Sequence, residues 1–281
     1  MTRHRKNVRA RILRSTAVLP AAFTLLNGLA GFAAIHFAAK DGLGAELDAG
    51  NLAHLKIAAG LIFAAMFCDM LDGRLARMTR TTSDFGAQLD SLCDIISFGV
   101  APAVLSLRSA VSILRSQFDM YLPVERTVWC IAAVYVACAT LRLARFNVET
   151  EQDEAAHMDF RGLPTPAAAA GLAAVLLMFT SLMGRNLTWL SDENLMLGMS
   201  VTLPVLTLVS GLLMVSRFRY PHVMNQYIRG RRPFGYLLKL LLLFLAAVTV
   251  GPYIVLAGAV LFYILSGPAR TTWLLIRKRR D

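Results

Sequence analysis

Four aspartates lie close together along this chain, in or beside segments that are otherwise apolar. Asp69 and Asp72 are three residues apart, and Asp90 and Asp94 are four residues apart. On an α-helix, either spacing places both side chains on one face. An aspartate at the centre of a membrane helix costs about 2.5–3.5 kcal/mol, so four of them require a functional explanation.

The two acidic pairs predict a metal site. A short polar turn, residues 79–83, separates them, so the two acidic helix faces are expected to meet. Two carboxylates about 5 Å apart repel each other by about 3 kcal/mol at an effective dielectric constant of about 20. Arg74 and Arg77 cannot balance four carboxylates, which argues against a purely structural ion-pair network. Oxygen-only ligation by all four aspartates suits Mg²⁺ or Mn²⁺, and the set is large enough for two ions.

The residues between the aspartates favour a ligand that carries phosphate. Gly73, Ala76 and Gly86 present almost no side chain, so a bulky group can approach the backbone there. Arg77 lies one turn after Gly73 and can hydrogen-bond a phosphate oxygen through its guanidinium group. The pattern therefore indicates a site for divalent metal and a phosphate ester where two helices adjoin.

The elements that must position these residues are membrane helices. The chain has 281 residues, of which 56% are hydrophobic and 17% charged, and its mean hydropathy is +0.55. Soluble domains carry about 25% charged residues, whereas a spanning helix needs about 20 apolar residues in succession. We therefore predict an all-α, polytopic transmembrane bundle of about eight helices. The predicted spans are Ala17–Ala39, Leu52–Arg74, Leu89–Leu107, Val128–Phe146, Pro164–Met183, Leu195–Val215, Tyr236–Val250 and Tyr253–Ile276.

The basic residues predict the orientation of the bundle. They lie between the apolar segments, so the net charge of +11 favours contact with the membrane surface over binding of nucleic acid. With both termini and the acidic site in the cytoplasm, most of the 29 Lys and Arg residues fall on the cytoplasmic side. We divide the chain into a basic N-terminal segment (1–16), a membrane core (17–219), a basic loop (220–235) and two C-terminal helices with a basic tail (236–281).

The candidate site residues also form a known pattern. The chain matches D-x-x-D-G-x-x-A-R-x8-G-x-x-x-D-x-x-x-D and thereby resembles the CDP-alcohol phosphotransferase family. The matching positions are Asp69, Asp72, Gly73, Ala76, Arg77, Gly86, Asp90 and Asp94. The resemblance implies a six-helix core, a homodimer, and two metal ions at the cytoplasmic side. This chain adds two C-terminal helices to that core. The resemblance also implies that the first six of these residues bind the CDP group and that Asp94 is the general base.

The residues around this signature resemble the phosphatidylserine synthase branch of the family. The stretches 90–103, 142–147 and 162–168 carry this resemblance. It implies transfer of a phosphatidyl group from CDP-diacylglycerol to L-serine in a bacterial inner membrane, giving phosphatidylserine and CMP. Ala21 stands where the family usually has Asn, and Gln88 where it usually has Glu.

Other interpretations stay open at this point. Glycerol 3-phosphate, inositol or choline are alternative acceptors, and a cation transporter is a remote alternative, because intramembrane carboxylates also occur in transporters. Transport, however, does not require the small residues of the signature.

Four polar residues are candidates for binding the acceptor or a lipid phosphate: Arg142, Arg145, Ser97 and Asn147. For the arginines, the alternative is placement at the membrane interface. For Ser97, it is helix packing. Gly28 and Gly31 are predicted to allow close packing of the first helix, with admission of the lipid as the alternative.

Overall fold

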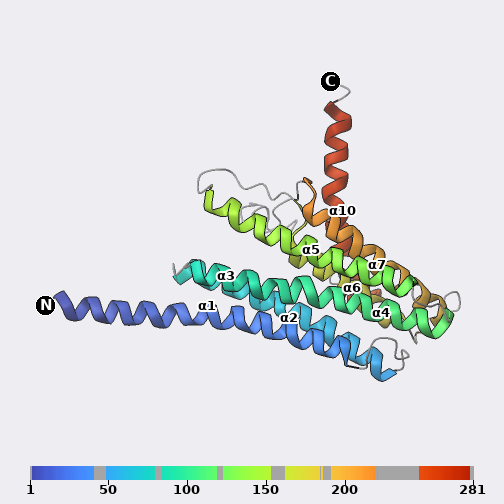
Figure 1. The fold of residues 1–281 in the computed structure, drawn as a ribbon, viewed down its shortest axis with the longest axis horizontal. Helices are drawn as coiled ribbons and strands as arrows, with labels where there is room; N and C mark the ends of the chain where they lie inside the picture. The colour runs from blue at the N-terminus through green and yellow to red at the C-terminus, as the bar shows by residue number, and fades with distance from the viewer. Residues whose placement is uncertain are drawn as a thin grey trace.

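The computed structural model describes residues 2–40, 49–79, 84–118, 123–152, 162–183, 185, 191–218, 220 and 247–278. Helices dominate these residues, and none of them forms a strand. In chain order the elements are α1 (Thr2–Ala39), α2 (Ala49–Thr79), α3 (Asp84–Asp94), the π-helical segment η1 (Ile95–Val100), α4 (Ala101–Phe118), α5 (Pro123–Gln152), α6 (Thr165–Leu182), α7 (Asp192–Val215) and α10 (Pro252–Lys278) (Figure 1).

The described helices confirm the predicted polytopic bundle. Within the part of the chain that the structure describes, seven stretches are long and apolar enough to cross a membrane, and each overlaps one of the predicted spans. The third is longer than predicted, because α3, η1 and α4 together provide a span from Phe85 to Arg115. Most of the predicted span Tyr236–Val250 lies outside the described residues. The predicted boundary between the spans Tyr236–Val250 and Tyr253–Ile276 is confirmed, since Gly251 has φ 120° and α10 begins at Pro252.

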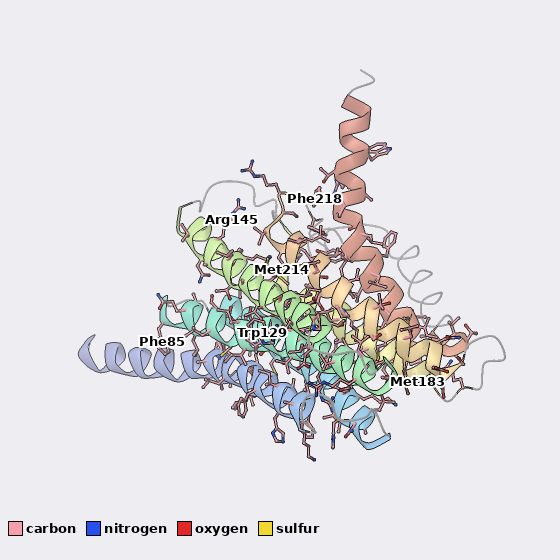
Figure 2. The ribbon with its side chains drawn as sticks, turned by 45° about the vertical axis from the view of Figure 1, so that its right-hand side comes forward. Phe85, Trp129, Arg145, Met183, Met214 and Phe218 are labelled. Atoms are coloured by element: carbon pink, nitrogen blue, oxygen red, sulfur yellow. The ribbon has the colours of Figure 1, made fainter. Side chains whose placement is uncertain are left out.

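The helices pack as neighbours in a way that brings α1, α2 and α3 together. The long helices α1 and α2 run side by side, while α3, η1 and α4 follow one another along α1 (Figure 1). On the other side of the bundle α5 packs on α7, and α10 leaves the bundle steeply after packing on α6. Phe85 and Arg145 lie toward one end of the bundle and Met183 toward the opposite end (Figure 2). The start of α3 and the end of α5 therefore face the same side.

Glycines allow α1 to approach the third span closely. A Cβ atom added to Gly28 would stand 2.9 Å from the Cys93 Sγ, and one added to Gly31 would stand 2.6 Å from the Ser97 Cα. Small residues at such contacts let membrane helices gain dispersion energy through their backbones. The packing interpretation of Gly28 and Gly31 is therefore confirmed.

The segment before α6 is fixed to the end of α7. Gly162 has φ 89°, a conformation that favours glycine, and its N–H donates to the Phe218 carbonyl at 2.8 Å. The Leu163 N–H donates to the Leu213 carbonyl at 3.0 Å. A side chain at Gly162 would overlap the Met214 carbonyl. These contacts determine where Thr165 and the start of α6 lie.

Tyr220 attaches the chain after α7 to α10. Its ring lies against Gly267, its hydroxyl donates to the Ile264 carbonyl at 3.1 Å, and the ring centroids of Tyr220 and Tyr263 are 5.8 Å apart. Burial, and then the nearby Tyr263, raise the pKa of Tyr220 to about 12. The hydroxyl therefore stays protonated and remains a donor at physiological pH.

Candidate metal and phosphate site

Three of the four predicted aspartates form a cluster. Asp69 and Asp72 come from the last turns of α2, and Asp90 comes from α3. One carboxylate oxygen from each lies within 4.8 Å of the corresponding oxygens of the other two. The spacing argument is confirmed to this extent: the acidic face of α2 meets the acidic face of α3.

Asp94 lies one turn further along α3, and its side chain is 8% exposed. It does not belong to the three-residue cluster, but its carboxylate interacts electrostatically with Asp69 and Asp90. Its Oδ1 accepts a hydrogen bond of 2.9 Å from the Asn27 Nδ2 on α1. This aspartate is therefore held from α1, outside the acidic pair of helices.

The cluster fits a hard divalent cation. The Asp72 Oδ2 and the Asp90 Oδ1 are buried and have no hydrogen-bond partner among the described residues. Buried carboxylate oxygens are costly when nothing compensates their charge. Carboxylate oxygens gathered this closely are the donors that Mg²⁺ and Mn²⁺ prefer. The two unpartnered oxygens are thus suitable ligand atoms.

The glycine of the signature leaves space beside the carboxylates. A Cβ atom added to Gly73 would meet no atom within 4 Å, so this side of α2 is open for a bulky group. Gly86 is half-buried in the first turn of α3. Ala76 and Arg77 were also predicted to contact the CDP group. The structure describes their backbone within α2 but not their side chains.

Directly after Asp94 the backbone widens into the π-helical segment η1, which the sequence analysis did not predict. Short π-helical turns occur frequently at functional sites. The Tyr135 hydroxyl on α5 donates to the Phe98 carbonyl at 3.0 Å, and Tyr135 is fully buried. Gly99, which lies beside Ala139, is the local sequence feature that could have pointed to an irregular turn.

The four acceptor candidates fall in different environments. Arg142 is largely buried, and its positive charge interacts with the Asp94 carboxylate. Its Nη1 donates a hydrogen bond of 2.8 Å to the Thr165 Oγ1. Arg145 is exposed at the end of α5 (Figure 2). Asn147 and Ser91 hydrogen-bond each other, with 2.9 Å from Asn147 Nδ2 to Ser91 Oγ. This pair joins α5 to α3 next to Asp90.

Ser97, the fourth candidate, is fully buried, and its hydroxyl donates to the Asn27 carbonyl at 2.8 Å. This contact supports the packing interpretation of Ser97, and a role in binding the acceptor stays a prediction. Two residues that the sequence analysis gave no role, Asn27 and Thr165, hold Asp94 and Arg142 in place. A polar side chain inside an apolar span is the signal that could have identified both.

Fold and site together define a polytopic helical membrane protein with a carboxylate cluster that could hold a divalent cation where two helices adjoin. Residues 17–213 match the CDP-alcohol phosphatidyltransferase family, and the chain belongs to that family. The match covers every aspartate of the site and ends before α10.

Curated relatives carry one and the same activity in their names. The chain is 33% identical over 223 residues to the CDP-diacylglycerol–serine O-phosphatidyltransferase of Helicobacter pylori strain J99, covering 79% of this chain and 82% of that protein. It is 34% identical over 177 residues to the enzyme of that name from Methanocaldococcus jannaschii, covering 63% and 70%. The enzyme of that name from Saccharomyces cerevisiae is 36% identical over 152 residues, covering 52% and 49%.

Proposed function

We propose that this protein transfers the phosphatidyl group of CDP-diacylglycerol to L-serine, giving phosphatidylserine and CMP. The family match and the names of the relatives support the reaction class and the acceptor. The observation that carries the proposal on the structural side is the cluster of Asp69, Asp72 and Asp90 with two unpartnered buried oxygens.

In this proposal the acidic residues would hold the divalent metal beside the place where the diphosphate binds. A bound Mg²⁺ or Mn²⁺ would supply positive charge to offset that of the diphosphate and of the CMP leaving group. Asp69, Asp72 and Asp90 would hold the first ion, and Asp94 would complete the set if a second ion binds. Gly73, Ala76, Arg77 and Gly86 line the CDP pocket, with the open side of Gly73 accepting the nucleotide or its phosphates.

Asp94 acts as the general base. The serine hydroxyl oxygen forms a bond to the phosphorus that carries the diacylglycerol, the bond from this phosphorus to the CMP oxygen breaks, and the hydroxyl proton passes to Asp94. Asn27 fixes the orientation of the Asp94 carboxylate by its hydrogen bond of 2.9 Å. Because Asp94 is buried, bulk water competes poorly with the acceptor for this position.

The orientation in the membrane follows from the positive charges. We place the acidic site and both termini on the cytoplasmic side, in a bacterial inner membrane, with 17–219 as the catalytic core. The basic loop 220–235 would lie against anionic lipid headgroups. We further propose a homodimer, on the resemblance to the family.

One assay tests the reaction. Purified protein is given CDP-diacylglycerol and a panel of L-serine, glycerol 3-phosphate, inositol and choline, and CMP release is measured with and without EDTA. We expect CMP release only with L-serine and only when divalent metal is present. If CMP is released with another alcohol and not with L-serine, that alcohol is the acceptor in place of serine. CMP release that EDTA does not affect would contradict the role of the metal.

A further inference from the structure

Asn27 presents an unused hydrogen-bond acceptor next to Asp94. The residue is fully buried on α1, and its backbone carbonyl is fixed by the Ser97 hydroxyl. Only the nitrogen of an amide can donate to a carboxylate, so the bond from Asn27 Nδ2 to Asp94 determines which way the amide faces. The Asn27 Oδ1 is then left buried without a hydrogen-bond partner among the described residues.

Arg142, whose charge also interacts with Asp94, presents an unused donor. Its Nη1 is anchored on Thr165, at the start of α6, and its charge reaches Asp94. Its Nε is buried and has no hydrogen-bond partner among the residues that the structure describes. Arginine cannot lose its proton in a protein, so this site carries a fixed positive charge and an available N–H.

The two unused atoms are chemical opposites, and both side chains interact with Asp94. Buried polar atoms are normally hydrogen-bonded, and exceptions often mark a site whose ligand is absent. A zwitterionic amino acid carries the complementary pair: a carboxylate that accepts and an ammonium group that donates. Binding both would leave the hydroxyl of serine as the group directed toward Asp94.

We infer that Asn27 and Arg142 form an amino-acid subsite, in which the Arg142 Nε binds the acceptor's carboxylate and the Asn27 Oδ1 binds its ammonium group. This inference rests on the proposed transfer to L-serine and adds a reason for its selectivity. Choline has no N–H to donate, inositol carries no charge, and glycerol 3-phosphate has no cation for Asn27. Each would leave at least one buried atom unpaired, which is how polar sites reject analogues.

Two half-ligands test the subsite separately. Ethanolamine has the ammonium group without the carboxylate, and 3-hydroxypropionate has the carboxylate without the ammonium group. Each is used as an inhibitor of the L-serine reaction, in the wild type, in Arg142→Gln and in Asn27→Leu, which keeps the size of the side chain without its polar atoms. The KM for CDP-diacylglycerol is measured in the same assay and is expected to stay unchanged.

The expected result is a crossed pattern. Losing a hydrogen bond to a charged group weakens binding by about 10- to 100-fold. Arg142→Gln should raise the KM for L-serine and the inhibition constant of 3-hydroxypropionate by this factor, with ethanolamine unaffected. Asn27→Leu should raise the KM for L-serine and the inhibition constant of ethanolamine, with 3-hydroxypropionate unaffected. Arg126→Gln, an exposed arginine at the other end of α5, is the matched control and should change none of them.

Outcomes that contradict the inference are distinct from failure of the proposed function. If the wild type releases CMP without L-serine, the proposed function fails. If release depends on L-serine but each variant shifts both half-ligands equally, the subsite is wrong and the two residues serve structure alone. The subsite is also wrong if neither half-ligand inhibits the wild type at concentrations far above the KM for L-serine.

Discussion

Gly31 and Ser97 are in backbone contact, since a Cβ atom on residue 31 would stand 2.6 Å from the Ser97 Cα. The contact lies one turn along α1 from Asn27, whose carbonyl accepts the Ser97 hydroxyl and whose amide holds Asp94. The approach of α1 to η1 therefore determines where the proposed base lies.

Replacing Gly31 by Ala should force α1 and η1 apart, because the Ser97 Cα stands in the way as well as the Ser97 side chain, and a backbone atom cannot rotate aside. Overpacking of this kind costs about 1–3 kcal/mol, and the activity should fall because Asn27 moves with α1. Thermal unfolding in detergent measures the first effect and CMP release the second. Gly60→Ala on α2 is the control, since a Cβ there meets nothing within 4 Å. Equal melting temperatures for the two variants would contradict the close contact.

Removing one carboxylate of the cluster should have opposite effects with and without metal. Asp72→Asn relieves repulsion with Asp69 and Asp90, so it should raise the melting temperature in EDTA, and it should weaken binding of Mn²⁺ by at least about tenfold. Electron paramagnetic resonance of Mn²⁺ gives the affinity without reference to activity. Glu193→Gln, exposed in the first turn of α7, serves as control. Unchanged Mn²⁺ affinity in Asp72→Asn would exclude this aspartate from the site.

Asp94→Asn should lower the turnover number by about 10²- to 10⁴-fold, the usual contribution of a general base. Binding of the nucleotide should be partly retained, because the cluster of Asp69, Asp72 and Asp90 remains. Single-turnover CMP release and binding of a CDP analogue separate the two effects. A variant that keeps full activity would show that the proton is taken by another group.

Tyr135→Phe should destabilise the third span by about 1–3 kcal/mol, since the buried Phe98 carbonyl of η1 would lose its donor at 3.0 Å. Thermal unfolding measures the loss, and Tyr253→Phe, at an exposed position on α10, is the comparison. If Tyr135→Phe and Tyr253→Phe both unfold at the same temperature as the wild type, the π-helical turn does not depend on the Tyr135 hydroxyl.

Local sequence patterns were enough to predict the membrane spans and the meeting of the two acidic helix faces. Apolar length predicted the seven membrane-spanning stretches of the described residues, and spacings of three and four residues predicted that Asp69 and Asp72 would face Asp90. Both rest on helix geometry, which is the same in every fold. The widened turn after Asp94 was not predictable in this way, since Tyr135 stabilises it from 37 positions along the chain.

By itself the sequence determined that the chain is a membrane bundle, where its described helices lie, and that the two acidic helix faces meet beside Gly73. Only the tertiary structure decided that Asp94 is held by Asn27 across 67 positions of sequence, that Arg142 is anchored on Thr165, and that two buried atoms of opposite character remain unused. The physical reason is range: helix periodicity acts over a few residues, whereas the orientation of a buried side chain depends on whichever distant helix packs against it.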